Sequence, residues 1–471
     1  MTATIELPIW LFVLILLFAG VTFASHFLFP SVRWFFRRRL EKAVSRLNER
    51  LERPIQPFKL ARRYDMIQRL IYDPDVTQAI HEHAVAEGIP DNVAFEHARR
   101  YAREIVPSFS ASAYFGFAIR AARLLSNALF RVRLGHVDEE ALKKIDRDAT
   151  VIFVMNHRSN MDYVLVTYLA AERSALSYAV GEWARVWPLS QLIRAMGAYF
   201  IRRKSRNELY RRVLARYVRL ATDAGVTQAM FPEGGLSLSG KLMPPKLGLL
   251  KYIADGFEPD GRDVVFVPVA LNYDRVLEDR FLMAAVHNPK RRFDASFHIV
   301  AGKTLKQIWL RMTGRYHKFG YAAVSFGTPL SLCDFMTGVQ GDPTMALGRE
   351  LMRRIGAIVP ILPVPMVAWV MQDGTPRTRA EVETAISALI ADLPHAHIHM
   401  PRGDRGYGAE VGLRALTERG ILRADGEGHF RLNPAETETV QFYANSIRHL
   451  MMPKIAKDSA GARELSAPAG S

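Results

Sequence analysis

Hydrophobic residues recur with two different periods along this chain, and the change between them divides it into regions. Residues 31–122 are rich in charge and carry apolar positions at helical spacing, which predicts a helical region. The prolines that divide it into short helices are Pro54, Pro57, Pro74, Pro90 and Pro107. From residue 123 to residue 335, apolar and β-branched runs that end in polar turns alternate with helical segments, which predicts an α/β domain.

The start of the chain has a different pattern. Residues 8–30 carry no formal charge and are mostly Leu, Ile, Val and Phe, and about 20 such residues suffice to cross a bilayer core. The basic residues that follow are Arg33, Arg37, Arg38, Arg39 and Lys42. Because basic flanks stay on the cytoplasmic side, we predict a single transmembrane helix over residues 8–30 with the large domain in the cytoplasm, against anionic membrane lipids.

The last part of the chain predicts a smaller module over residues 336–455. Residues 358–371 are apolar but contain three prolines, which predicts core or a surface that touches the membrane. Residues 405–432 predict a helix followed by a hairpin with Asp425 and Gly426 at its tip, a winged-helix-like arrangement. Residues 440–452 predict a terminal helix. Small and polar residues from 456 to 471 predict a disordered tail.

The amino-acid composition limits the classes of protein to which this chain can belong. The 471 residues are 49% hydrophobic and 23% charged, which indicates a folded chain with a large core. The formal net charge of +16 indicates acidic partners such as anionic lipid, phosphorylated ligands or nucleic acid. Because Cys333 is the only cysteine in the sequence, an internal disulfide and a cysteine-rich metal site are excluded.

The candidate chemistry centres on residues 151–169, VIFVMNHRSNMDYVLVTYL. Residues 151–155 predict a buried strand that ends at a polar turn, residues 156–160, which contains His157. Ser159 or Asn160 is placed to cap the helix that follows. Asp162 then falls in the first helical turn, where negative charge is favoured. It could bond one imidazole nitrogen of His157, fix the tautomer and leave the other nitrogen as a base. The alternative is a polar turn in which the histidine only satisfies backbone groups.

This stretch resembles the HxxxxD signature of the glycerolipid acyltransferases, and its Arg158 and Ser159 resemble the branch that acylates glycerol 3-phosphate. Residues 197–204, GAYFIRRK, resemble that branch's second motif, whose arginine binds the substrate phosphate. The resemblance assigns this role to Arg202 or Arg203. Arginine also suits bidentate phosphate binding at the end of a buried strand.

Two further segments follow in the family's order. Residues 227–241, TQAMFPEGGLSLSGK, resemble the third motif, so Glu233 and Gly234 are expected to shape the glycerol phosphate site together with Lys241. Leu236 and Leu238 stand where arginines are common in the family. Residues 264–278 predict a strand broken at Pro268 and resemble the fourth motif, with Pro268 lining the cleft. Residues 324–332 resemble the family's closing strand.

The third segment also has a second interpretation. Its end, GLSLSGK, is close to the nucleotide-binding loop GxxxxGK[ST]. Leu242 replaces the required hydroxyl, however, and Pro244 and Pro245 prevent the helix that this loop needs. We therefore exclude a nucleotide site of this type.

The resemblance implies a mixed sheet flanked by helices and transfer of an acyl group from acyl-CoA or acyl carrier protein to the sn-1 hydroxyl of glycerol 3-phosphate. His157 would act as the base and Asp162 would orient it. Arg158, Arg202, Arg203 and Lys241 would hold the phosphate, with no metal or bound cofactor. Dihydroxyacetone phosphate or a lysophospholipid could be the acceptor instead. The alternative of another class is a non-catalytic scaffold that binds anionic lipid or nucleic acid, although no nucleic acid partner is expected.

Overall fold

The computed structural model describes residues 8–170, 174–181, 189–202, 205, 207–287 and 319–451, without the side chains of residues 21–37, 40, 189 and 402. Two compact units can be distinguished. One comprises residues 1–55 with 172–174, and the other comprises the rest of the chain. Arg203 and the predicted tail at 456–471 lie outside the described residues.

The first unit contains a single long helix, α1 (Ile9–Asn48). The predicted boundary at residue 30 is therefore not the end of a helix, because the helix continues through the basic segment that follows. Large apolar side chains from Ile9 to Phe18 are exposed. Among the described residues, however, no helix combines the length and the apolar character needed to cross a membrane.

Short helices open the second unit, and prolines begin several of them. Pro57 and Pro74 are first-turn residues, and Pro90 precedes a helix, since the fixed φ of proline suits a helix start. These helices are α2 (Pro57–Leu60), α3 (Arg63–Ile71), α4 (Pro74–Glu87), α5 (Asp91–Ile105), the π-helix η1 (Ser112–Ala118) and α6 (Ile119–Leu129). The predicted series of short helices is confirmed.

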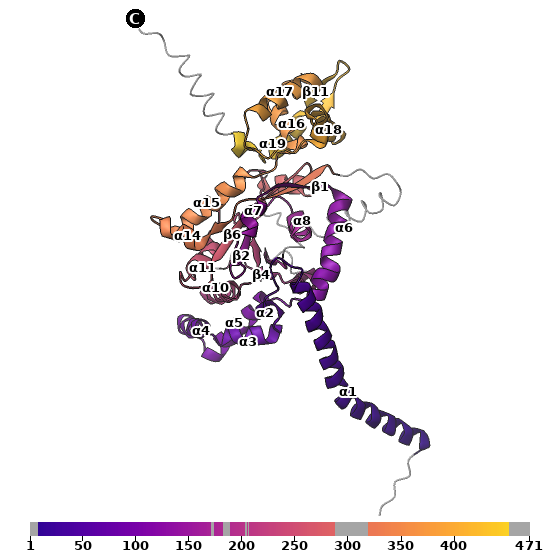
Figure 1. Ribbon diagram of the computed structural model, residues 1–471, viewed down its shortest axis with the longest axis vertical. Coiled ribbons are helices and arrows are strands. Elements are labelled where there is room, and N and C mark those ends of the chain that lie inside the picture. Colours follow the sequence, from indigo (N-terminus) through magenta and orange to yellow (C-terminus); the bar gives the residue numbers. More distant parts are fainter. Residues whose placement is uncertain are drawn as a thin grey trace, which may run out of the picture. The chain divides into compact units, whose positions relative to one another are not determined.

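An eight-stranded sheet forms the centre of the second unit (Figure 1). Its strands are β1 (Arg131–Val137), β2 (Thr150–Met155), β3 (Ser177–Gly181), β4 (Tyr199–Ile201), β5 (Gln228–Met230), β6 (Val264–Tyr273), β7 (Tyr321–Phe326) and β8 (Leu330–Ser331). The order is β1-β7-β6-β2-β5-β3-β4, and β8 also pairs with β6. Strands β2 to β6 pair in parallel, whereas β7 and β8 run antiparallel to β6. The predicted mixed α/β sheet is confirmed.

Helices cover both faces of this sheet. Alternate residues of β2 point to opposite faces, so Phe153 and Met155 join one core cluster while Ile152 and Val154 join another. The helices of this region are α7 (Glu139–Lys143), α8 (Met161–Leu169), α9 (Leu189–Ala195), α10 (Glu208–Asp223), α11 (Gly248–Ala254), α12 (Asp279–His287), α14 (Leu332–Gly338) and α15 (Pro343–Ala357). Helix α15 lies beyond the predicted domain boundary at residue 335, yet it packs in the same cluster as β6.

Strand β6 is not broken at Pro268, which corrects the sequence-based expectation. Pro268 lies in the middle of the strand, opposite Val154 of β2. Its carbonyl accepts a hydrogen bond from the Gly327 amide at 2.8 Å, so its missing N–H faces that same side. On that side of β6, Pro268 lies between the residues that pair with β8 and the residues that pair with β7. The proline therefore removes no ladder hydrogen bond at this position.

The C-terminal part consists of α16 (Pro363–Met371), β9 (Arg377–Thr378), α17 (Arg379–Ala391), η3 (Pro401–Gly403), α18 (Arg405–Glu418), β10 (Leu422–Ala424), β11 (His429–Leu432), η4 (Pro434–Glu436) and α19 (Thr437–Ala444). The strands form a small antiparallel sheet in the order β10-β11-β9. Helix α16 is buried, so its prediction as core is confirmed. The predicted helix over residues 440–452 is confirmed in part: α19 ends at Ala444, a turn interrupts it, and residues 448–451 are helical again.

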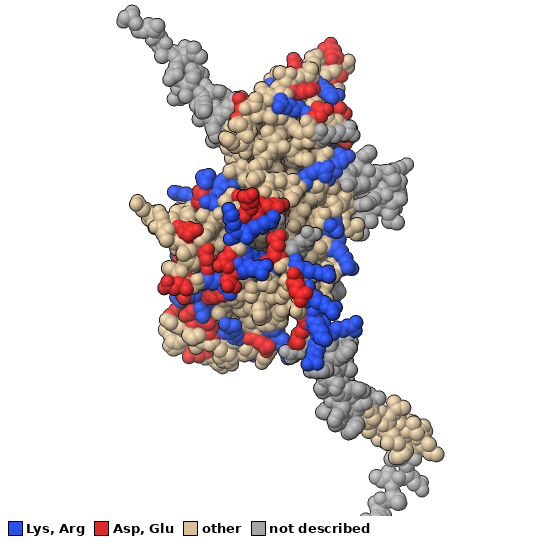
Figure 2. All heavy atoms as spheres, viewed as in Figure 1, with Lys and Arg blue, Asp and Glu red and all other residues tan. Residues whose placement is uncertain are grey.

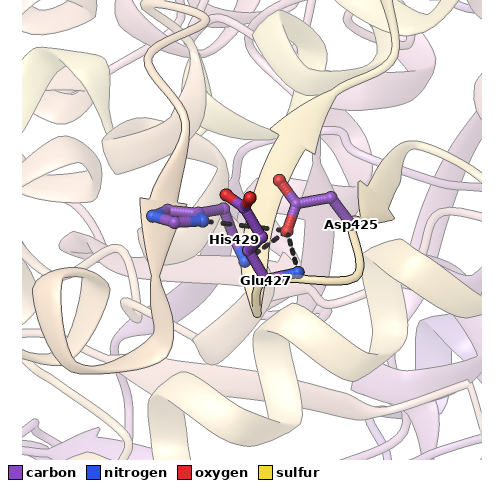
Figure 3. Close-up of side chains that lie close together, drawn as sticks. All are labelled: Asp425, Glu427 and His429. Atoms are coloured by element: carbon purple, nitrogen blue, oxygen red, sulfur yellow. Dashed lines mark hydrogen bonds and ion pairs between the residues drawn. The ribbon is translucent and has the colours of Figure 1, made fainter.

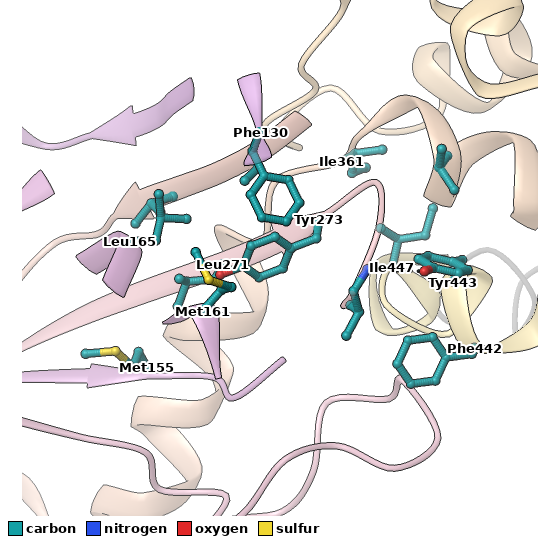
Figure 4. Packing of buried hydrophobic residues seen from close by; sticks show 14 of the residues in the cluster. Phe130, Met155, Met161, Leu165, Leu271, Tyr273, Ile361, Phe442, Tyr443 and Ile447 are labelled. Carbon is teal, nitrogen blue, oxygen red and sulfur yellow. Dashed lines mark hydrogen bonds between the residues drawn. The ribbon is translucent and has the colours of Figure 1, made fainter. Parts of the chain in front are cut away.

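One hydrophobic core joins this C-terminal part to the main sheet. Figure 4 shows Tyr273 and Leu271 of β6 in the same cluster as Phe442 and Tyr443 of α19. Buried hydrogen bonds reinforce the contact: the Asn272 side chain donates to the Pro360 carbonyl at 2.9 Å. The C-terminal part is therefore packed as an extension of the sheet layer.

Candidate active site

His157 lies in the turn between β2 and α8, where the sequence predicts it. Its Nδ1 is 2.9 Å from Oδ2 of Asp162, and both side chains are almost completely buried, at 1% and 0% exposed. The turn brings them together because Asp162 is in the first turn of α8. A carboxylate there keeps the proton of a neutral imidazole on Nδ1. Any proton transfer by His157 then falls to Nε2.

Asp162 is also fixed from three other directions. Its Oδ2 accepts hydrogen bonds from the backbone amides of Arg158 at 2.7 Å and Ser159 at 3.0 Å. Its Oδ1 accepts from the hydroxyl of Tyr273 at 2.7 Å. Such a set satisfies a buried carboxylate and fixes its orientation. The base and its partner are thus positioned before any substrate arrives.

Aromatic rings hold the imidazole from its faces. The Phe231 ring stacks on His157 with centroids 3.9 Å apart and an interplanar angle of 23°. Tyr163 meets it edge-on at 5.5 Å. Together with the bond to Asp162, these contacts leave the ring little freedom to rotate.

Glu233 ties the histidine turn to the segment after β5. It is buried, and its two oxygens accept from the amides of His157 at 2.9 Å and Met243 at 3.0 Å. Burial raises the pKa of Glu233 from 4.5 to about 7, although the two amide bonds act in the opposite direction. Its role in this structure is to position the turn, because Glu233 does not line the pocket described next.

The raised pKa of the Glu233 carboxyl should make the stability of the protein depend on pH. Since its pKa is higher in the folded chain, the folded state binds more protons between pH 4.5 and pH 7. The free energy of unfolding should therefore fall as pH rises through this window. In the Glu233→Gln variant the fall should be smaller, which denaturant titrations at pH 5 and pH 7 would measure. Equal falls in the two proteins would contradict this cause.

A pocket of about 610 Å³ opens beside His157. The aliphatic side chains along it are Ala179, Ile201, Leu214, Met230, Leu236, Leu238, Leu249 and Leu250. Its charged lining residues are Arg202, Arg211 and Lys246. Within the described residues no carboxylate lines it. The pocket therefore offers an apolar wall, a histidine and a positive electrostatic field, a combination that suits an anionic amphipathic ligand.

Arg202 reaches the pocket but is already paired. Its guanidinium forms two hydrogen bonds to Glu104 of α5, at 2.8 and 2.7 Å, and it lies against the rings of Tyr101 and Tyr210. A ligand phosphate would share this arginine with a carboxylate. Arg203, the other candidate from the sequence, lies outside the described residues.

Arg158 and Ser159, two of the other predicted binding residues, do not line this pocket. Arg158 is buried, donates to the Gly240 carbonyl and lies over the ring of Phe442, and burial lowers its pKa. The Ser159 hydroxyl donates to Glu278 at 2.8 Å and accepts from the amide of Met161, the first residue of α8, at 3.1 Å.

Of the other predicted binding residues, Lys241 and Pro268 lie away from the pocket and Gly234 lines it. The side chain of Lys241 is exposed, and its carbonyl accepts from the Ser237 hydroxyl at 2.7 Å. Pro268 is buried within β6. Gly234 does line the pocket, with φ of +68°, and its amide donates to the Phe231 carbonyl at 2.9 Å. Of the predicted binding residues described, Arg202 and Gly234 therefore join His157 at the pocket.

Four residues of this site were not predicted from the sequence: Tyr273, Glu278, Lys246 and Glu104. Glu278 accepts from the Asn160 amide and the Ser159 hydroxyl, both at 2.8 Å. Tyr273 and Glu278 stand in the fourth segment, where attention to polar residues after the strand could have found them. Lys246 follows Pro244 and Pro245, and Glu104 lies almost a hundred positions before its partner, so neither had a local signal.

The loop after β5 is held by the C-terminal helix. At Gly240, φ is +80°, and a Cβ there would lie 2.0 Å from the Phe442 carbonyl oxygen. The Asn445 side chain donates to the Ser239 carbonyl at 2.9 Å. Helix α19 therefore closes over the loop that Arg158 contacts.

The Gly240→Ala variant should be strongly destabilised, by about 2–4 kcal/mol, since backbone overpacking adds to the penalty of positive φ. Gly374→Ala is the matched control, because φ is +79° there and no atom lies within 4 Å of a Cβ. The control should lose only about 1 kcal/mol. Urea unfolding of the two variants measures the difference, and equal losses would show that the Phe442 contact is not tight.

One group of side chains elsewhere has the spacing of metal ligands. Asp425, Glu427 and His429 lie together at the tip of the β10–β11 hairpin (Figure 3). The Asp425 carboxylate already accepts from the amides of Glu427 at 3.0 Å and His429 at 2.8 Å, and it pairs with Arg431 at 3.2 Å. These bonds stabilise the hairpin turn, and we assign no metal to them.

Comparison with known proteins identifies the region that contains the site. Residues 136–272 match the model of a family described as Acyltransferase. This stretch holds His157, Asp162, Glu233 and the pocket-lining residues Arg202 and Lys246. The chain contains an acyltransferase domain. The HxxxxD turn, the Glu233 anchor and the pocket all belong to this acyltransferase domain.

Curated relatives extend the similarity beyond the acyltransferase domain. A glycerol-3-phosphate acyltransferase of Pseudomonas fluorescens (strain Pf0-1) is 28% identical over 375 residues, 73% of this chain and 43% of the relative. The enzyme of that name from Ectopseudomonas mendocina is 29% identical over 429 residues, 83% of this chain and 49% of the relative. The chain thus spans less than half the length of the curated relatives it matches.

A solved structure is also similar in part. It is the 1-acyl-sn-glycerophosphate acyltransferase of Thermotoga maritima, 18% identical, with a TM-score of 0.31 over 59% of this chain and 92% of that one.

Proposed function

We propose that this chain transfers a fatty acyl group from a thioester to the sn-1 hydroxyl of glycerol 3-phosphate and forms lysophosphatidate for phospholipid synthesis. The observation that supports this most is the buried His157–Asp162 pair at the wall of a pocket whose described charged residues are all basic. The relatives that carry the name glycerol-3-phosphate acyltransferase support the choice of acceptor.

The proposed reaction is a direct transfer. Nε2 of His157 takes the proton of the acceptor hydroxyl as its oxygen attacks the thioester carbonyl, while Asp162 stabilises the imidazolium that forms. The C–O bond forms, the C–S bond breaks, and the proton passes from His157 to the leaving thiolate. No acyl-enzyme is needed, because the nucleophile belongs to the substrate. Neither a metal nor a bound cofactor takes part in these steps.

The charge of the pocket favours a phosphorylated acceptor. Arg202, Arg211 and Lys246 line it without a carboxylate among the described residues. Arg203 remains a candidate for the phosphate alongside them. Arg158 and Lys241, which do not line the pocket, would act on the phosphate only through the shape of the loop between Glu233 and Lys246.

Membrane association is the second part of the proposal. Nine large apolar side chains between Ile9 and Phe18 are exposed, and Arg38, Arg39 and Lys42 follow on the same helix. Figure 2 shows the apolar end of α1 free of charged atoms and basic residues farther along it. Such a helix suits an anchor with its basic end at an anionic, cytoplasmic surface. The donor, acyl-CoA or acyl carrier protein, and the lipid product would meet the enzyme there.

The decisive assay offers labelled long-chain acyl-CoA to the detergent-solubilised full chain with glycerol 3-phosphate, dihydroxyacetone phosphate or lysophosphatidate in parallel. We expect the label to move to glycerol 3-phosphate. Preference for another acceptor would keep the mechanism and replace the substrate. If no acceptor is labelled with either acyl-CoA or acyl carrier protein as donor, the proposed function is wrong.

A further inference from the structure

Among the described residues, Lys246 differs from the other cations of the pocket in having no ion-pair partner. In the described part of the chain it pairs with no carboxylate, whereas Arg202 pairs with Glu104 and Arg211 with Glu208. Its side chain is exposed and lines the same pocket as His157. A paired cation must exchange its carboxylate for a ligand anion, but an unpaired one offers its full charge.

The backbone fixes where this lysine begins. The Lys246 amide donates to the Pro232 carbonyl at 2.8 Å. Pro232 follows Phe231, whose ring stacks on the His157 imidazole. The amide of Ser237, in the loop between them, donates to the His157 carbonyl at 3.0 Å. Lys246 is therefore attached to the same rigid turn that positions the catalytic base.

Gly234 opens the path of the lysine side chain. A Cβ at Gly234 would lie 2.6 Å from Cδ of Lys246 and 3.4 Å from its Cβ and Cγ. The aliphatic stem therefore runs directly against the glycine backbone. Any larger residue at position 234 would push this stem aside, and φ of +68° adds a further reason for glycine.

We propose that Lys246 holds the phosphate of the acceptor in the pocket and that Gly234 positions it by leaving room for its stem. This assignment rests on the proposed function, and it deepens that function by naming the residue that selects a phosphorylated acceptor. An ammonium group on a stem anchored beside His157 would bind the phosphate end while the hydroxyl end meets Nε2.

The test measures the Michaelis constant and kcat for glycerol 3-phosphate in Lys246→Met. A lost charged hydrogen bond should raise KM by roughly 10- to 100-fold with kcat little changed, because this binding is equal in ground and transition states. Lys246→Arg should recover part of the loss. The matched control is Lys251→Met, an exposed lysine of α11 that does not line the pocket and pairs with Asp255. Its KM should equal that of the wild type.

Direct binding separates this inference from the proposed function. Titration calorimetry of glycerol 3-phosphate into the full chain should show weaker binding in Lys246→Met, whether or not acyl transfer occurs. If the wild type binds without turnover, the reaction is wrong while Lys246 is still tested. If the wild type does not bind, both ideas fail. An unchanged dissociation constant in the variant, or an equal change in Lys251→Met, would overturn the assignment of Lys246.

Gly234 is tested by coupling. Gly234→Ala should raise KM in the wild-type background but add little to Lys246→Met, because the displaced stem no longer carries a charge. Thermal unfolding of each variant excludes a folding defect as the cause. An equal rise of KM in both backgrounds would overturn the positioning role of Gly234. If KM rises in Lys241→Met but not in Lys246→Met, Lys241 binds the phosphate and the assignment of Lys246 is wrong.

Discussion

Replacement of His157 by alanine should reduce kcat for acyl transfer by about 10²–10⁴-fold, the usual contribution of a general base. The physical reason is that no second base is available at the pocket: within the described lining, no carboxylate and no other histidine is present. The binding of glycerol 3-phosphate should change far less, because the charged groups remain. Single-turnover kinetics and calorimetry on the same preparation measure the two effects separately.

His157 also packs against Phe231, so a folding defect must be distinguished from a chemical one. His157→Gln keeps more of the buried volume and should lose activity to a similar extent. His287→Gln is the control, since His287 is exposed and pairs with Glu438 outside the pocket. If His157→Gln unfolds like the wild type and still transfers acyl groups at a near-normal rate, His157 is not the base.

Asp162→Asn should cause the second large loss, again about 10²–10⁴-fold in kcat, and it should also lower stability. Oδ2 of Asp162 accepts from Nδ1 of His157 and from the amides of Arg158 and Ser159. An amide nitrogen in that place cannot accept these bonds, and each buried donor left without a partner costs about 1–3 kcal/mol. If the amide oxygen takes that place instead, its nitrogen faces Tyr273.

Tyr273→Phe separates orientation from chemistry. It removes only the hydrogen bond to Oδ1, so the contacts of Oδ2 with His157 remain. We expect a loss of stability of about 1–3 kcal/mol with most of the activity retained. Urea unfolding and initial rates measure the two quantities. Activity losses as large as in Asp162→Asn would show that the whole carboxylate moves when the tyrosine bond is removed.

The parts of this site that could be predicted from sequence are those whose partners are close in the chain. His157 and Asp162 are five positions apart across one strand–turn–helix unit, so their spacing is enough to bring them together. The predicted strands of the acyltransferase domain are present for the same reason, since apolar runs that end in turns report local structure. The mixture of parallel and antiparallel strands was predicted only from the family resemblance.

The rest depends on contacts between distant segments. Arg202 pairs with Glu104, which lies far earlier in the chain. No residue close to Arg202 in the sequence indicates this ion pair. Pro268 predicted a broken strand because its effect depends on which neighbour its missing N–H faces. Lys246 follows two prolines in a loop, and the hydrogen bond from its amide to the Pro232 carbonyl returns that loop to the pocket.

The contact between α19 and the loop around Gly240 has a consequence for the synthesis of the protein. A ribosome releases the chain from its N-terminus at roughly 5–20 residues per second, so on the order of tens of seconds separate the emergence of His157 from that of Phe442. During that interval the loop after β5 lacks its cover. We therefore expect the proposed acyl transfer to begin only after α19 has been synthesised and has packed on this loop.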